Sequence, residues 1–158
     1  QGSDLVVVSA GSSVGARDET AGAVAAVGDI WCHGLAIKPG KPTLLAECGG
    51  VPLIGLPGNP LSALVVFGQI GIPLLWRISG CCTPPARPNV RARLSRDLAS
   101  VAGRLDVVQV KVTDGVAEPL FGPSALLSVL TRADGYIVIP EPATGLDAGV
   151  DVDVTLYP

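Results

Sequence analysis

Residues 9–15 form a loop of mostly small residues, Ser-Ala-Gly-Ser-Ser-Val-Gly, and Asp18 follows at the expected start of a helix. Small side chains let backbone N–H groups approach an anion, and the positive end of the helix dipole adds attraction. The spacing matches neither the Gly-Lys-Ser/Thr phosphate loop nor the Gly-x-Gly-x-x-Gly dinucleotide motif. The loop is therefore a candidate anion site, and an ordinary flexible connection explains it equally well.

A second loop places Lys38 and Lys41 three positions apart, with Pro39 and Pro42 stiffening the chain between and after them. Cations held in fixed positions stabilise an oxyanion without a further ordering cost. Only three lysines occur in the chain, and two of them stand here. We expect this pair to bind an oxyanion, and two solvated surface lysines are the alternative.

A third loop, Pro57-Gly58-Asn59-Pro60, joins a strand-like run to a long apolar segment. Gly58 allows close backbone approach, and Asn59 can either cap the following helix or bind the edge of a heterocycle. Pro60 suits the first helical turn, where its missing N–H costs nothing. A binding turn and a purely structural cap both fit this sequence.

The elements around these loops alternate in the manner of an α/β layer. Strands are expected over 4–9, 31–37, 44–46 and 51–56, and helices from 18 to about 27 and from 60 to 78. The run over 4–9 is uninterrupted and β-branched, as in a buried parallel strand. All three loops then lie at the carboxyl edge of one sheet, where α/β domains bind ligands.

The chain changes character near Gly80. Three prolines over 81–88 indicate a linker, and strand-length apolar runs follow at 90–94, 107–112, 136–139 and 150–156, with a short helix over 124–130. We therefore expect residues 1–80 to form an α/β unit, 81–88 a linker and 89–158 a small, mostly β domain.

Bulk composition excludes several classes of protein. Apolar residues make up 48% and charged residues 16%, unlike a disordered chain. The net charge of −3 leaves no basic stripe for nucleic acid. Four cysteines (Cys32, Cys48, Cys81 and Cys82) and one histidine lack the spacing of a zinc site, and we expect buried thiols in a reducing cytoplasm. Leu61–Ile78 is better explained as a buried helix than as a membrane span because Gln69, Pro73 and Arg77 interrupt it.

Three segments in order and spacing resemble the molybdopterin molybdenumtransferase family, the MoeA and gephyrin E-domain group. These segments are residues 9–18, 36–42 and 55–63; the second half adds Gly103-Arg104-Leu-Asp, 123–128, 133–135 and 149–152. The resemblance implies the second half of a molybdopterin-binding α/β domain, which we expect to begin inside that domain, followed by a C-terminal β domain. It also implies a homodimer of four-domain subunits, and a piece that is inactive alone.

The family's reaction inserts molybdate into adenylylated molybdopterin with Mg²⁺-assisted loss of AMP. Carried over by resemblance, the residues of the molybdopterin pocket would be Ser9, Gly11, Ser13, Gly15, Pro57, Gly58, Asn59, Pro60 and Ser62. Those of the catalytic set would be Asp18, Lys38, Lys41, Arg104 and Ser124. No metal ligands are assigned. Anions of this kind call for cations and backbone donors rather than a nucleophile.

Three positions depart from the family pattern. Ala10 replaces a usual glycine, which is a mild change. Gly34 stands where many members carry a basic residue, and Gln109 stands where they often carry an arginine. Either neighbours such as His33 compensate, or activity is weakened. A molybdopterin-binding or scaffolding protein that has lost catalysis is therefore the alternative to an active transferase, and a sensor built on the same α/β domain fits poorly because of the added β domain.

Overall fold

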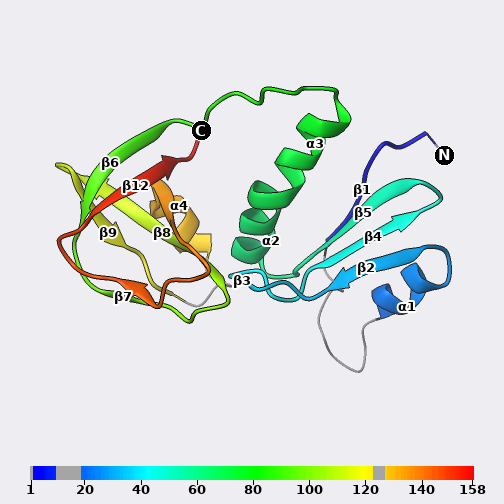
Figure 1. The fold of residues 1–158 in the computed structure, drawn as a ribbon, viewed down its shortest axis with the longest axis horizontal. Helices are drawn as coiled ribbons and strands as arrows, with labels where there is room; N and C mark the ends of the chain where they lie inside the picture. The colour runs from blue at the N-terminus through cyan, green and yellow to red at the C-terminus, as the bar shows by residue number, and fades with distance from the viewer. Residues whose placement is uncertain (1, 10–18, 123–126) are drawn as a thin grey trace. The chain divides into compact units, whose positions relative to one another are not determined.

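The computed structural model describes residues 2–9, 19–122 and 127–158, which fall into two compact units. The first contains residues 1–35 and 39–84, and the second contains 36–38 and 85–158. The ribbon in Figure 1 follows the chain through both. Each unit is described by itself below.

The first unit is built on a four-stranded sheet of order β1-β5-β4-β2. Its strands are β1 (Val6–Ser9), β2 (Asp29–His33), β4 (Leu44–Cys48) and β5 (Val51–Leu56). The expected parallel strand is β1, which pairs parallel with β5, while the other two pairings are antiparallel. The expectation that β1 is buried is wrong: it is an edge strand with Val7 42% exposed, because the described sheet has no neighbour on its outer side.

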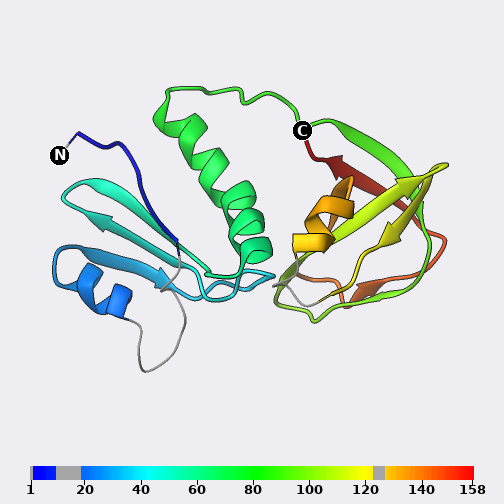
Figure 2. The ribbon, with the colours of Figure 1, turned by 180° about the vertical axis from the view of Figure 1, so that it is seen from behind.

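Helices cover both faces of this sheet, which makes three layers (Figures 1 and 2). Helix α1 (Glu19–Ala25) packs Val24 against Leu44, Ala46 and Leu53 on one face. Alternate strand residues point to opposite faces, so Ile54 and Leu56 pack on the other face against Val66 of the second helical segment.

That second segment runs continuously over Pro60–Ile78 as α2 (Pro60–Val66), a π-helical turn η1 (Phe67–Gly71) and α3 (Ile72–Ile78). Pro73 lacks an N–H and would clash with the carbonyl four residues earlier. Widening the turn before Pro73 removes that clash, and Gly71 leaves room for the ring of Phe67, which a Cβ would meet at 2.4 Å. The helix predicted over 60–78 therefore forms, with a local change of winding.

The same segment is buried only on its sheet-facing side. The expectation of a buried helix therefore holds for α2, which buries Leu61, Val65 and Val66, whereas Leu64, Leu75 and Ile78 are 45%, 40% and 38% exposed. By length and composition alone Pro60–Ile78 could also cross a membrane, with a mean hydropathy of 1.6, a property that core helices of α/β domains share. The cysteines depart from expectation in the same way, since Cys82 is exposed and the other three are half-buried.

The single strand expected over 31–37 is wrong, because Gly34 divides it. Gly34 has φ of +103° and donates its N–H to the Thr43 carbonyl at 2.8 Å, which ends β2 at His33. The next residues, Ala36–Lys38, belong to the second unit, where β3 (Ile37–Lys38) pairs parallel with β8 (Leu105–Thr113). Lys38 is therefore a strand residue rather than a loop residue.

The second unit is a small β barrel. Its sheet has the order β10-β12-β6-β9-β8-β3, and an additional pairing of β10 with β8 closes the ring. The remaining strands are β6 (Asn89–Leu94), β9 (Val116–Pro119), β10 (Gly135–Ile139) and β12 (Asp151–Leu156). Buried residues such as Leu94, Val110, Ile137 and Val154 fill the interior.

Shorter elements complete this unit. Asp114 and Gly115, with φ of 51° and 75°, form the tight turn of the β8–β9 hairpin. β7 (Leu98–Ala99) pairs with β11 (Gly145–Leu146), and α4 spans Leu127–Arg132, where a short helix is expected. Strands β7, β9 and β11 are not predicted from sequence because each is too short to show a pattern.

A polar cluster holds the ends of the second unit against the sheet. Arg87 donates to the Tyr136 hydroxyl at 2.6 Å, and the Tyr157 hydroxyl donates to the Gln109 amide oxygen. The two tyrosine rings lie 5.7 Å apart. Burial, and then Tyr136, raise the pKa of Tyr157 to about 12, against the opposite effects of Gln109 and Arg87.

This shift predicts a loss of stability at alkaline pH. The folded state favours the protonated phenol, so Tyr157 contributes fully below the pKa of an unfolded tyrosine, about 10, and the contribution is lost as pH rises towards about 12. Tyr157→Phe should therefore flatten the decline in unfolding free energy over this interval. Urea unfolding at a series of pH values measures it, and equal slopes in both proteins would contradict the assignment.

Candidate functional site

The first and third loops singled out from the sequence begin at one edge of the first unit's sheet, and the second loop returns to this edge where β4 begins at Leu44. Ser9, the last residue of β1, is in register with Leu56, the last residue of β5. One residue earlier on β5, Gly55 is in register with Leu44 of β4, and Leu44 is in register with His33, the last residue of β2. The carboxyl ends of β1, β2 and β5 thus lie together, as the α/β reading predicts.

The first loop is described only at its start, where Ser9 is exposed. The predicted residues Gly11, Ser13, Gly15 and Asp18 lie outside the described residues, and Ser124 of the second unit does too.

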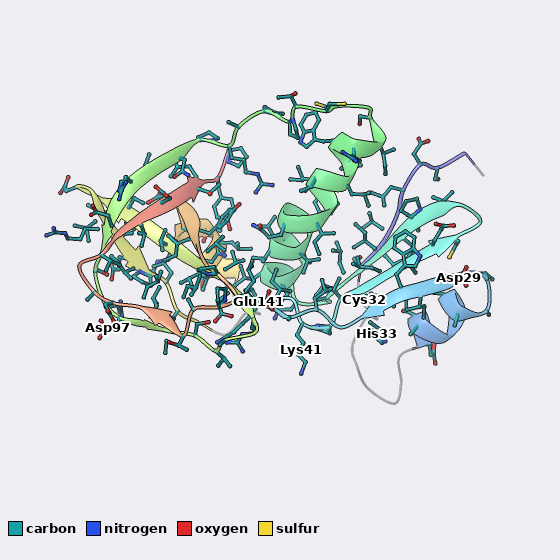
Figure 3. The ribbon with its side chains drawn as sticks, viewed as in Figure 1. Asp29, Cys32, His33, Lys41, Asp97 and Glu141 are labelled. Atoms are coloured by element: carbon teal, nitrogen blue, oxygen red, sulfur yellow. The ribbon has the colours of Figure 1, made fainter. Side chains whose placement is uncertain are left out.

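Backbone hydrogen bonds fix the second loop where it carries Lys41. The Lys41 carbonyl accepts the N–H groups of Leu35 and Thr43 at 2.8 and 2.9 Å, and the buried Thr43 hydroxyl donates to the Gly40 carbonyl at 2.6 Å. The Lys41 side chain is exposed and extends away from the loop (Figure 3). A fixed backbone with a solvated cation suits the binding of an anion from solution.

The third loop is largely a helix cap. The Asn59 side-chain oxygen accepts the Ser62 N–H at 3.4 Å, and Pro60 occupies the first helical turn. Pro57 and Ser62 are buried, whereas Gly58 is exposed. Of the residues predicted in this loop, Gly58 offers backbone to solvent, and Asn59 performs the capping role that the sequence left open.

Lys38 belongs to the second unit. In the parallel pairing of β3 with β8, Lys38 is in register with Asp106, and the Ala36 carbonyl accepts the Leu105 N–H at 2.9 Å. Lys38 and Lys41 thus belong to different units, Lys38 being the last residue of β3, and the binding of an oxyanion by this pair stays a prediction.

Arg104 belongs to the same strand edge as Lys38. Its Nε and Nη2 atoms donate to the two carboxylate oxygens of Asp106 at 2.6 and 3.0 Å. Asp106 is 4% exposed, whereas the Arg104 side chain is 31% exposed. The hydrogen bond to Asp106 and then its charge raise the pKa of Arg104 against the effect of burial, so the guanidinium is a permanent cation here. Arg104 is therefore paired with a buried carboxylate, and Lys38 occupies the position in register with that carboxylate on the neighbouring strand.

Asp106 is the site residue that sequence reasoning missed. Its signal was present, because residues two apart on a strand share a face, and Arg104 and Asp106 have opposite charges. Within residues 2–9, 19–122 and 127–158, no group of three or more His, Cys, Asp or Glu side chains could hold a metal ion.

Gln109, one of the departures from the family pattern, occupies a buried position on β8. Gln109 is 3% exposed and lies on the face of β8 opposite to Asp106, because it is three residues further along the strand. Its Nε2 group has no hydrogen-bond partner within the described residues. In this unit a cation at position 109 would stand on the other side of the strand from Arg104.

Comparison with known proteins gives two family matches and consistent relatives. Residues 1–77 match the model of a probable molybdopterin binding domain, and residues 91–157 match the MoeA C-terminal region, domain IV. A putative molybdopterin biosynthesis protein of Methanocaldococcus jannaschii is 35% identical over 97% of this chain and 36% of its own length. The molybdopterin molybdenumtransferase of Haemophilus influenzae is 32% identical over 96% of the chain and 39% of its own length.

Solved structures agree with the fold. A molybdopterin biosynthesis MoeA protein of Pyrococcus horikoshii superposes with a TM-score of 0.78 at 37% identity, over 97% of this chain and 37% of that one. A molybdenum cofactor biosynthesis protein of Pyrococcus furiosus gives 0.71 at 29% identity over 82% of this chain and 46% of its own. The chain thus spans little more than a third of the curated relatives described above.

The backbone at Gly34 predicts that a basic residue is poorly tolerated there. At φ of +103° a side chain is strained whatever space surrounds it, so Gly34→Lys should lower the free energy of unfolding by about 1–3 kcal/mol. Gly22→Lys is the matched control, since Gly22 lies in α1 with nothing within 4 Å, and it should be neutral or stabilising. Urea denaturation of both variants measures this, and an unchanged Gly34→Lys protein would refute it.

Proposed function

Because the chain belongs to the molybdopterin molybdenumtransferase (MoeA) family, with a molybdopterin-binding domain followed by the MoeA C-terminal domain, we propose that it carries part of the site that inserts molybdate into adenylylated molybdopterin and releases AMP. The chain's relatives act in molybdenum cofactor biosynthesis. The observation that carries the finer proposal is the pairing of Arg104 with the Asp106 carboxylate, with Lys38 in register with Asp106 on the adjacent strand β3.

The reaction brings together a molybdate dianion and an adenylylated phosphate, so its transition state concentrates negative charge. Fixed cations lower the energy of such a state most when their positions are set before binding. Lys38 is anchored by the β3 backbone, and Arg104 by two hydrogen bonds to Asp106. We assign both to the molybdate, and Lys41 to the phosphate. Ser124 of the second unit is assigned to the molybdate by resemblance alone.

The edge formed by the ends of β1, β2 and β5 is proposed to bind molybdopterin. Small residues follow Ser9 in the sequence, and Gly58 offers exposed backbone just after the end of β5, whose last residue is in register with Ser9. Pro57, Asn59, Pro60 and Ser62 shape the turn that holds Gly58 in place. Gly11, Ser13, Gly15 and Asp18 join this pocket by resemblance alone.

Other properties stay predictions. Mg²⁺ as a cofactor, a homodimer as the working assembly and no turnover by this chain alone rest on the family likeness. A cytoplasmic location and the lack of a nucleic-acid or membrane partner rest on the charge, the cysteines and the interrupted apolar segment of the sequence. No step is derived through Mg²⁺.

A second candidate is a molybdopterin-binding or scaffolding protein of the same fold that has lost catalysis. Gln109 favours it, because a neutral, buried amide replaces an arginine that family members often carry. Such a protein binds molybdopterin and releases no AMP from the adenylylated form.

Removing Lys38 tests the proposed transferase. Lys38→Ala should lower kcat/KM for AMP release by about 100-fold, the scale of one lost oxyanion contact. Lys111→Ala is the control, since Lys111 is an exposed lysine further along β8 and should leave the rate unchanged. The assay uses the whole gene product with adenylylated molybdopterin and molybdate. An unmodified protein that binds molybdopterin without releasing AMP would favour the scaffolding function instead.

A further inference from the structure

We propose that Asp106 is a positioning residue of the molybdate site, which orients the Arg104 guanidinium and balances the charge of the two cations beside it. This inference rests on the proposed function, because it takes Arg104 as a ligand of the oxyanion. The segment Gly103-Arg104-Leu-Asp that carries the resemblance ends at Asp106, but the sequence alone assigns this residue no role.

The geometry of the pair is that of a fork. Nε and Nη2 of Arg104 lie on one edge of the planar guanidinium, and each donates to a different oxygen of Asp106, at 2.6 and 3.0 Å. Two parallel bonds fix the plane of the guanidinium as well as its position, which one bond does not. The remaining N–H groups of Arg104 then face in a set direction, and 31% of the side chain is open to solvent.

Burial separates this pair from an ordinary surface ion pair. The Asp106 side chain is 5% exposed, so its carboxylate depends on Arg104 to replace water. The unit also holds a surface pair, Arg91 with Asp151, at 3.7 Å and with side chains 73% and 56% exposed. Exposed pairs of that kind contribute little and hold no fixed geometry. The ion pair of Asp106 is thus buried on its carboxylate side and fixed in geometry, whereas the ion pair of Asp151 is exposed to solvent.

The position of Lys38 gives Asp106 its second role. Lys38 is in register with Asp106 across β3 and β8, and paired residues of parallel strands point to the same face. Two cations at one strand edge repel each other, and the Asp106 carboxylate, which pairs with Arg104 and is in register with Lys38, reduces that repulsion. Asp106 therefore allows Lys38 and Arg104 to occupy one edge before an anion arrives.

The test measures the KM for molybdate and the kcat of AMP release in the whole gene product. Asp106→Asn keeps the shape and removes the charge and the fork, and it should raise the KM for molybdate by about 10- to 100-fold, the range seen when the group that orients a ligand side chain is removed. Arg104→Lys keeps the cation without the fork and should behave similarly. Asp106→Glu, which retains a carboxylate, should recover part of the loss. Asp151→Asn is the matched control and should leave both constants unchanged.

The double variant Arg104→Lys/Asp106→Asn decides between positioning and a general structural role. If Asp106 acts through the fork, the double variant is no worse in KM than Arg104→Lys alone; additive losses would overturn the inference. If Asp106→Asn fails to fold, an unchanged KM in Arg104→Lys overturns it as well. A normal KM in Asp106→Asn together with a raised KM in Arg104→Ala refutes this inference and leaves the proposed function standing. A normal KM in both variants refutes the assignment of Arg104 itself.

Discussion

Strand β8 pairs with three other strands, and the second unit depends on that backbone ladder. One edge of β8 meets β10 over residues 106–110, while β9 and the two residues of β3 pair with its two ends. Alternation along the strand then separates two environments. Val108 and Val110 belong to the barrel interior, Asp106 holds Arg104, and Gln109 joins the tyrosine cluster on the opposite face. The backbone pairings of β8 thus position the barrel core, the edge that carries Lys38 and Arg104, and the tyrosine cluster that holds the ends of the unit.

Local patterns in the sequence predict most of the regular elements. The apolar runs of β5, β6, β10 and β12 have strand length, and Asp114-Gly115 marks its hairpin directly. The meeting of the loop starts at one sheet edge also follows from strand–loop–helix alternation, and the register of Ser9 with Leu56 confirms it. In each case the information lies within a few neighbouring residues.

Long-range pairing is what the sequence conceals. Nothing near Ala36–Lys38 indicates that this segment leaves one unit to pair with Leu105 and Asp106, almost seventy positions away. Lys38 was therefore expected beside Lys41 in a loop, whereas its backbone is held by β8. The π-helical turn before Pro73 is likewise a tertiary compromise, since a helix packed on a sheet accommodates a proline by local widening instead of ending. Asp106 was given no role because the sequence alone does not indicate that this carboxylate is buried and paired with Arg104.

Because Ala36–Lys38 belong to the second unit while the residues on either side belong to the first, the two units cannot be separated by a single cut in the chain. The chain passes between the units at 35–36, at 38–39 and at 84–85, so they are tied by more than the proline-rich linker. Proteolytic nicking within 81–88 would leave β3 covalently attached to the first fragment and paired with β8 in the second. A fragment beginning at Pro85 would lack the strand that covers Leu105 and would lose Lys38 with it. The C-terminal domain, continuous in sequence, is completed in space by three residues from outside it.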